Sequence, residues 1–231
     1  MKILRRGFSR KYEELKLRID SVDVLVAVKE AFRYSELSSL LDIPVPILSK
    51  YYQGLTIPSK ETSEIIISRL LSREVVRDFI RRLIHSKKYG SLVKLLSNPL
   101  ITNYLSLCFY MKIIDQLAGT SVSALIAPPD TSVLLAIGIA YRLNVPLALI
   151  PSVTTPIYES LELMKEVGID KGSSTIAMYS ILGRECIPYL KKFMESLKLD
   201  LKFVGAVILA DRFIINAVSY THLRAHETRH D

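Results

Sequence analysis

The sequence predicts an α/β protein in which an all-helical domain is followed by a domain built on a parallel sheet. Apolar residues recur at helical spacing through residues 1–90, and short apolar runs alternate with helical segments through residues 91–216. The charge is also divided unevenly, with 18 basic and 11 acidic side chains in residues 1–90 but 13 and 12 in residues 91–231. This asymmetry favours a polyanionic partner for the first domain. A solvated basic surface would give the same count.

The composition of the 231 residues, 49% apolar and 23% charged, excludes a disordered tail, a collagen-like chain and a disulfide scaffold. The two cysteines, Cys108 and Cys186, form no CxxC motif or Cys/His cluster, so neither a zinc site nor a disulfide framework is indicated. A reducing cytoplasm is the expected location. The N-terminus is charged and lacks an apolar signal-peptide core. No apolar run approaches the roughly 20 residues of a membrane span, so we expect no membrane association.

We interpret residues 217–231 as an artefactual tail. Residues 218–228, VSYTHLRAHET, resemble the translation of a sequencing adapter read through in one frame. His222, His226 and His230 lie in this tail, so a metal-binding role for them is set aside. The second domain is then expected to be C-terminally truncated near Asn216.

Three short helices are expected early in the first domain. Residues 21–32 place apolar side chains on one helical face, and residues 35–41 form a helix with Ser35 as its N-cap. A further helix, 46–53, begins with a proline and ends at Gly54.

The remainder of this domain is expected to be a long amphipathic helix, or two, over residues 63–88. Its arginines recur every four residues, at positions 69, 73, 77 and 81. Such a row is usually a solvated face, and here it can also flank DNA or lie opposite a dimer seam. The hydrophilic stretch 85–90 is the expected linker.

Residues 34–59, YSELSSLLDIPVPILSKYYQGLTIPS, resemble the helix-turn-helix of the phage-repressor family. The frame of that family is filled by Leu37, Leu41, Ile43, Leu48, Ser49, Tyr51, Gly54, Pro58 and Ser59. The family usually has a small residue, often glycine, at the turn, where this chain has Asp42. Aspartate tolerates left-handed backbone geometry better than most residues, so the turn is expected to be kept.

The resemblance implies that the second helix lies in the major groove of duplex DNA with its N-terminal side chains at the base edges. Those side chains are Val45, Pro46, Ser49 and Lys50. Lys50 can donate to guanine, whereas Val45 and Pro46 can contact only a thymine methyl. Phosphate contacts, which position the protein without specifying sequence, are expected from Ser35, Gln53 and Lys60. The alternative is a helix-turn-helix used only for packing or dimerisation.

The second domain is expected to alternate helices and strands. Helices are predicted over 98–119, 132–144, 156–168 and 185–198, and strands over 122–128, 145–151, 173–180 and 202–210. The continuous apolar character of the strands indicates a parallel sheet covered on both faces. Ligands of such sheets bind at the carboxyl ends of the strands. The candidate loops are therefore 128–132, 151–155 and 180–185.

Two segments of this half resemble type I phosphoribosyltransferases by pattern rather than residue by residue. Residues 127–150 correspond to that family's pyrophosphate loop, helix and next strand, and residues 174–212 to its phosphoribosyl-diphosphate loop with the flanking strands and helix. The resemblance implies a site for a phosphorylated or nucleotide-like small molecule, made of Asp130, Thr131, Ser132, Ser180, Gly183, Arg184 and Glu185. A helix-turn-helix ahead of such a domain is the arrangement of archaeal, and some bacterial, metabolite-sensing regulators.

This chain departs from that family where the chemistry lies. The family ends a strand with two adjacent acids that hold the ribose hydroxyls, followed by a turn whose backbone N–H groups cradle the 5′-phosphate. Here the acids are absent, while Gly183 remains and Arg184 can pair with a phosphate. Residues 130–132 offer no cation. Since a magnesium-diphosphate site supplies the main electrostatic stabilisation of such a reaction, we expect binding without catalysis, with no catalytic residue, metal or cofactor. The alternative for residues 180–185 is a plain strand-to-helix turn.

These features predict a cytoplasmic, sequence-specific DNA-binding transcriptional regulator. Domain 1–90 would bind duplex DNA, and domain 91–216 would sense a small metabolite or dimerise. A homodimer is expected, reading half-sites about one helical turn apart. Two alternatives stay open. One is an active nucleobase phosphoribosyltransferase of orotate or purine type with an extra N-terminal domain, which turnover of phosphoribosyl diphosphate would establish. The other is a scaffold that pairs subunits without binding DNA.

Overall fold

The computed structural model describes residues 9–86, 88–117, 121–149, 162, 164–182 and 202–211, with the side chains of 180–182 and 202–211 left out. The chain forms two compact units, Met1–Cys108 and Phe109–Asp231, which we call unit 1 and unit 2. The division falls within the helix α7 (Pro99–Gln116).

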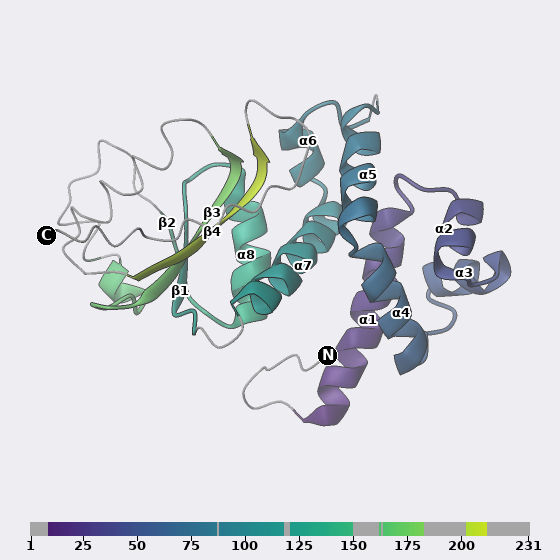
Figure 1. Cartoon of the computed structure of the whole chain (residues 1–231), viewed down its shortest axis with the longest axis horizontal. Coiled ribbons are helices and arrows are strands. Elements are labelled where there is room, and N and C mark those ends of the chain that lie inside the picture. Colours follow the sequence, from purple (N-terminus) through teal and green to yellow (C-terminus); the bar gives the residue numbers. More distant parts are fainter. Residues whose placement is uncertain are drawn as a thin grey trace, which may run out of the picture. The chain divides into compact units, whose positions relative to one another are not determined.

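Unit 1 is helical and begins with α1 (Arg10–Val28), α2 (Tyr34–Leu41) and α3 (Val45–Tyr52) (Figure 1). The predicted spans of α2 and α3 are confirmed to within one residue at each end. Helix α1 starts well before the predicted residue 21, because Ser9 caps its N-terminus by accepting a hydrogen bond from the Tyr12 backbone N–H.

The turn between α2 and α3 lies at Asp42, whose φ of 58° and ψ of 40° are left-handed, as predicted. Ser35 is not the N-cap of α2, so that prediction is wrong. Arg33 occupies the cap, and its backbone N–H donates to the Glu36 carboxylate at 2.7 Å. This bond, together with the Arg82 side chain, holds the pKa of Glu36 below its usual value.

Helix α3 begins one residue earlier than expected. Pro44 is its N-cap, so Val45 is helical although it precedes a proline, and Pro46 is the second helical residue rather than the first. Gly54 ends the helix as predicted, with φ of 69°. The N–H groups of Gly54 and Leu55 donate to the carbonyls of Tyr51 and Lys50 at 3.0 and 2.9 Å, which is a Schellman arrangement.

The predicted helical stretch 63–88 is two helices, α4 (Lys60–Leu70) and α5 (Arg73–Ile84), and residues 85, 86 and 88 are not helical. The row of arginines is therefore divided between them. They are followed by the short helix α6 (Leu92–Leu96) and by α7. The core of unit 1 pairs the rings of Phe79 and Tyr104, with centroids 4.9 Å apart. The Tyr104 hydroxyl donates to the Leu70 carbonyl oxygen at 2.6 Å. Burial raises the pKa of Tyr104 well above its usual value, so the hydroxyl remains a donor.

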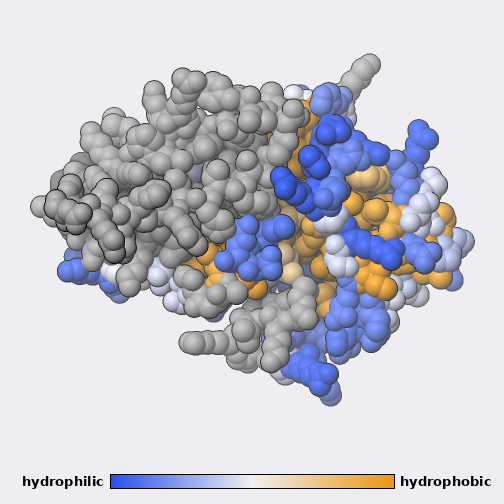
Figure 2. All heavy atoms as spheres, viewed as in Figure 1, coloured by the Kyte–Doolittle hydropathy of each residue, from blue (hydrophilic) through white to orange (hydrophobic). Residues whose placement is uncertain are grey.

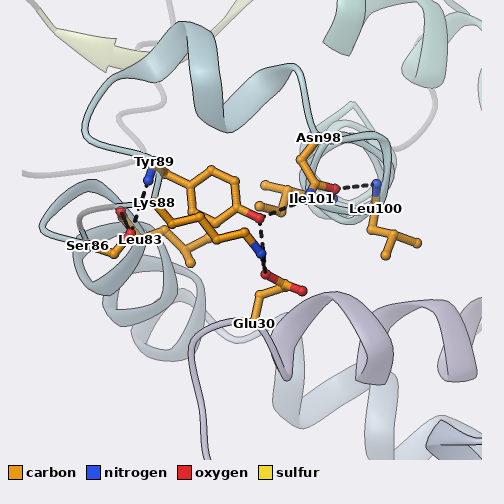
Figure 3. Close-up of polar contacts among 8 residues, drawn as sticks. All are labelled: Glu30, Leu83, Ser86, Lys88, Tyr89, Asn98, Leu100 and Ile101. Carbon is orange, nitrogen blue, oxygen red and sulfur yellow. Dashed lines mark hydrogen bonds and ion pairs between the residues drawn. The ribbon is translucent and has the colours of Figure 1, made fainter.

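The stretch 85–90, expected as a hydrophilic linker, is held against α1 by the buried Tyr89 (Figure 3). The Tyr89 hydroxyl donates to the Glu30 carboxylate at 3.0 Å and accepts from the Asn98 amide at 2.7 Å. The Lys88 ammonium donates to the same carboxylate at 2.6 Å. The hydrogen bond from Lys88 is the main reason that the pKa of Glu30 lies below its usual value. This segment is therefore packed into unit 1.

Unit 2 contains a four-stranded parallel sheet in the order β2-β1-β3-β4, which confirms the predicted parallel sheet. The strands are β1 (Ala124–Ala127), β2 (Leu147–Leu149), β3 (Ser174–Leu182) and β4 (Lys202–Asp211). Helix α8 (Ser132–Leu143) connects β1 to β2 and ends at Asn144, which is left-handed with φ of 57°. Of the predicted helix 156–168, residues 162 and 164–166 are helical, while residues 156–161 and 163 lie outside the described residues. The predicted helix 185–198 also lies outside them.

Strands β3 and β4 extend beyond β1 at the carboxyl edge of the sheet. Ile126 of β1 is in register with Ala177 of β3, whereas Leu182 at the end of β3 is in register with Asp211 of β4. Because β1 ends one residue after Ile126, β3 continues past it for four residues, or about 13 Å at the usual rise. The loop after β1 therefore lies beside an overhanging pair of strands.

Candidate nucleic-acid interface and candidate ligand site

Helix α3 presents most of its surface outward. Leu48 is its one fully buried residue, and the sequence-predicted contacts Val45, Pro46, Lys50 and Gln53 are all exposed. At 100° per residue, the direction opposite Leu48 falls between Pro46, Lys50 and Gln53. Those three side chains form the centre of the outer face of α3, which therefore points away from the core.

The other predicted DNA contacts lie away from the centre of this face or on neighbouring helices. Ser49 is half-buried and lies near the Gln53 amide, with Nε2 to Oγ at 3.4 Å. Ser35 is exposed on α2, and Lys60 is half-buried at the first position of α4. The Ser59 side chain caps α4 by accepting from the Thr62 N–H at 3.2 Å, which fixes where Lys60 begins that helix.

Sequence reasoning missed an apolar part of this surface. Ile47 is 41% exposed on the first turn of α3, and Leu55 and Ile57, just after the helix, are 67% and 47% exposed. Figure 2 shows hydrophobic residues at the surface among the charged residues of unit 1. The signal was available, because Ile47 directly precedes Leu48 and neighbouring residues on a helix point in different directions.

A groove of about 340 Å³ elsewhere on unit 1 has the opposite charge character. It lies between α2 and α5, with Glu36, Glu74 and Asp78 around apolar residues. Arg82 pairs with Glu36 at 2.7 Å and with Asp78 at 2.9 Å, and its guanidinium lies 4.3 Å from the centroid of the Phe32 ring. With three carboxylates and one cation, this groove does not suit a polyanion.

The candidate ligand site of unit 2 lies where the strand order of its sheet changes direction. The strand that follows β1 along the chain is β2, on one side of β1, whereas β3 lies on the other side and is followed by β4 still further out. The connections that leave the carboxyl ends of β1 and β3 therefore diverge. In open α/β sheets such a switch point is where ligands bind. The predicted residues 128–132 and 180–185 are the segments that follow these two strands.

Asp130 closes the N-terminus of α8. Its carboxylate accepts the Ser132 backbone N–H at 2.6 Å, while its own N–H donates to the Pro128 carbonyl at 2.8 Å. Asp130 is exposed, Thr131 is half-buried and Ser132 is fully buried. A carboxylate thus occupies the position where a helix N-terminus would otherwise favour a bound anion. At this loop the protein offers an acceptor for hydroxyl or cationic groups.

The remaining predicted ligand contacts are only partly described. Ser180 lies in the overhanging part of β3, but its side chain, and all of Gly183, Arg184 and Glu185, lie outside the described residues. Among the residues described, no group of three or more His, Cys, Asp or Glu side chains could hold a metal ion. No described helix is long and apolar enough to cross a membrane.

No protein-family profile matches the sequence, and no curated protein matches it. Among solved structures, the chain is similar to an adenine phosphoribosyltransferase at 14% identity and a TM-score of 0.43, over 53% of this chain and 76% of that one. It is also similar to adenine phosphoribosyltransferase from Saccharomyces cerevisiae, complexed with an imino-altritol bisphosphate and adenine. That match has 11% identity and a TM-score of 0.44, over 54% of this chain and 76% of that one.

UMP synthase of Leishmania donovani is similar at 19% identity and a TM-score of 0.43, over 66% of this chain and 35% of that one. Within unit 2 itself, the strand order and register define a parallel sheet with a switch point between β1 and β3.

Proposed function

We propose that this chain is a sequence-specific DNA-binding transcriptional regulator, in which unit 1 binds duplex DNA. The observation that carries the proposal is the outward-facing helix α3, held by the buried Leu48 on the far side of a left-handed turn at Asp42. In a helix-turn-helix, the second helix enters the major groove and its N-terminal side chains meet the base edges.

The charge of the first part of the chain supports a polyanionic partner. Residues 1–90 carry 18 basic and 11 acidic side chains. Helix α3 has no acidic residue, and Lys50 lies at the centre of its outer face. Contacts with phosphates come mainly from lysine and arginine and make binding salt-dependent. We therefore expect Lys50 to be a base contact and Lys60, at the start of α4, to be a phosphate contact, together with Ser35 and Gln53.

Unit 2 is proposed to sense a small metabolite or to dimerise. A phosphorylated or nucleotide-like ligand at the switch point would direct its hydroxyl groups to Asp130, because that carboxylate already lies on the N-terminus of α8 and repels a phosphate. Its anionic group would then be expected near Arg184, which follows β3 in the sequence. A dimer would read half-sites centred about 34 Å apart.

The test is a titration of fluorescent duplex DNA with the full chain, first with random-sequence duplexes at low salt and then at rising salt. We expect binding whose logarithm falls linearly with the logarithm of salt concentration. Absence of binding at low salt across the random library would overturn the proposal, and dimerisation without DNA binding would favour a scaffold.

Lys50→Ala provides the finer test. It should reduce the preference for selected over random duplexes about tenfold, as expected for the loss of one good base contact. The matched control is Lys94→Ala, which removes one exposed cation from α6 of the same unit. The control should change the affinity for both kinds of duplex little and equally. An equal effect of the two substitutions would leave DNA binding intact but remove Lys50 from base recognition.

A further inference from the structure

The first turn of α3 exposes apolar side chains where a recognition helix usually carries polar ones. Val45 is 38% exposed and Ile47 is 41% exposed, and Pro46 between them is also exposed. No acidic residue lies in the first turn, and the helix sequence VPILSKYY contains no amide side chain. Lys50, on the next turn, is the one charged side chain of α3.

The helical geometry gives these residues three directions around α3, with Val45 about 60° from the buried Leu48 and still 38% exposed. At 100° per residue, Pro46 and Lys50 lie near the centre, within about 40° of each other. Val45 lies to one side of that centre and Ile47 to the other, each about 100° from Pro46. Lys50 near the centre thus has Ile47 about 60° to one side and Val45 about 140° to the other.

Apolar side chains can recognise only one base edge in the major groove. Thymine presents a C5 methyl group there, whereas guanine, adenine and cytosine present hydrogen-bond donors and acceptors without such a group. An isoleucine or valine placed against a polar edge would take that edge out of water without pairing it, which is unfavourable. Against a thymine methyl the same side chain buries apolar surface on both partners, which is favourable.

We propose that α3 recognises its DNA through thymine methyl groups, with Val45 and Ile47 as the specificity-determining residues on the two sides of Lys50. The inference rests on the proposed DNA-binding function. The preferred half-site would place thymines on both sides of the base pair that meets Lys50, and guanine is the base that a lysine pairs best. The methyl contacts, rather than hydrogen bonds, would carry most of the preference.

The occupant of this apolar surface is taken to be DNA, not protein, because of the charge around it. The acidic groove of unit 1 lies between α2 and α5, whereas Lys50 lies between the exposed apolar side chains of α3 and no carboxylate is present on that helix. A hydrophobic protein partner would need no cation at the centre of its interface. Duplex DNA provides both the anion and the methyl groups.

The experiment selects the preferred duplexes from a random library with the full chain, and then replaces each thymine of the selected site by deoxyuridine. This substitution keeps base pairing and removes only the methyl group. We expect each contacted thymine to contribute three- to fourfold in affinity, the effect of burying one methyl-sized group. The positions affected should lie on both sides of the base pair that meets Lys50.

Double-mutant cycles assign each methyl to its side chain. In Val45→Ala, deoxyuridine at the position read by Val45 should no longer weaken binding, whereas deoxyuridine at the position read by Ile47 should still do so, and the reverse is expected for Ile47→Ala. The matched control is Ile65→Ala, which removes an isoleucine side chain that is 42% exposed on α4. It should leave every deoxyuridine effect unchanged.

The outcomes separate the inference from the function on which it rests. Tight, sequence-specific binding that is indifferent to deoxyuridine would overturn the methyl recognition and leave DNA binding standing. Loss of all duplex binding in the parent chain would overturn both. If Val45→Ala or Ile47→Ala lost binding through unfolding, circular dichroism would reveal it, and the deoxyuridine series on the parent chain would still decide the question.

Discussion

The outer face of α3 and the loop after β1 offer opposite chemistry to a ligand, although each adjoins a helix whose N-terminus could attract an anion. Helix α3 has no side-chain hydrogen bond at its N-cap Pro44 and carries Lys50 on its outer face. Helix α8 begins with the carboxylate of Asp130 bound to the Ser132 N–H. The first surface can receive a polyanion, and the second already holds an anion of its own.

The difference teaches that the position of a helix N-terminus does not by itself define a phosphate site. The partial positive charge at such an end attracts anions, but a side chain of the same protein can satisfy it first. In unit 2 a ligand phosphate would have to displace Asp130 or lie elsewhere. In unit 1 no side chain caps the N-terminus of α3, and the exposed Lys50 is the one charged residue of that helix.

The largest effect is expected from removing the side chain that holds α3 in place. Leu48→Ala should lower the free energy of unfolding of unit 1 by about 3 kcal/mol, because it leaves a cavity at a fully buried site. Chemical denaturation followed by circular dichroism would measure it. Ile47→Ala is the matched control on the outer face and should cost less than about 0.5 kcal/mol. Equal losses would mean that the two sides of α3 are not as different as their exposure indicates.

A smaller effect is expected at the start of α8. Asp130→Ala should lower the free energy of unfolding of unit 2 by about 1 kcal/mol, because the Ser132 N–H loses its acceptor. Asp130→Asn should cost less, since the amide oxygen still accepts that bond. Thermal melting with and without inorganic phosphate is the measurement. Phosphate should stabilise Asp130→Asn more than the parent chain, and equal stabilisation would contradict the role of the carboxylate charge.

The left-handed turns of the two units allow a paired test. Asp42→Gly should raise the free energy of unfolding by up to about 1 kcal/mol, because glycine adopts φ of 58° without a Cβ clash. Asn144→Gly, at φ of 57° after α8, is the counterpart in unit 2 and should behave alike. Thermal unfolding would show both shifts. A strongly destabilising Asp42→Gly would indicate that the aspartate side chain has a further role in the turn.

The smallest effect concerns pH. The pKa of Glu30 is lowered from 4.5 in the folded chain, so its contacts with Lys88 and Tyr89 stabilise unit 1 above pH 4.5. That stability is lost as the pH falls through the folded pKa. Urea unfolding from pH 7 to pH 3 should therefore show the parent more stable than Glu30→Gln at pH 7 by a few tenths of a kcal/mol in free energy of unfolding. This difference should shrink as the pH falls. Glu14→Gln, on α1, is the control, and a difference between parent and Glu30→Gln that stays constant with pH would contradict the assignment.

Most of the described elements were predictable from the sequence because they depend on local patterns, although α6 was not predicted. Continuous apolar runs such as ALIA in β1 marked buried parallel strands, and the proline and glycine around α3 marked its two ends. The start of α1 was missed because RKYEELK contains few apolar residues, and the capping serine at position 9 was the signal that was available.

The candidate sites were predictable only in part. The packing of Tyr89 depends on Glu30, 59 positions away, and no local pattern reveals such a partner. The capping role of Asp130 was within reach, since aspartate just before an apolar helical run is a start signal. Ile47 was overlooked as a surface residue because an apolar type suggests burial, whereas its angle on the helix turns it away from Leu48.

The Tyr104 hydroxyl has a practical consequence for dissecting the protein. Tyr104 lies on α7, packs its ring against Phe79 of α5 and donates to the last carbonyl of α4. Helices α4 and α5 are therefore stabilised by a helix that comes later in the chain. Truncation at residue 90 would remove Tyr104 and expose the Phe79 ring to water. A version of unit 1 made on its own should therefore extend through Cys108, where the compact unit ends.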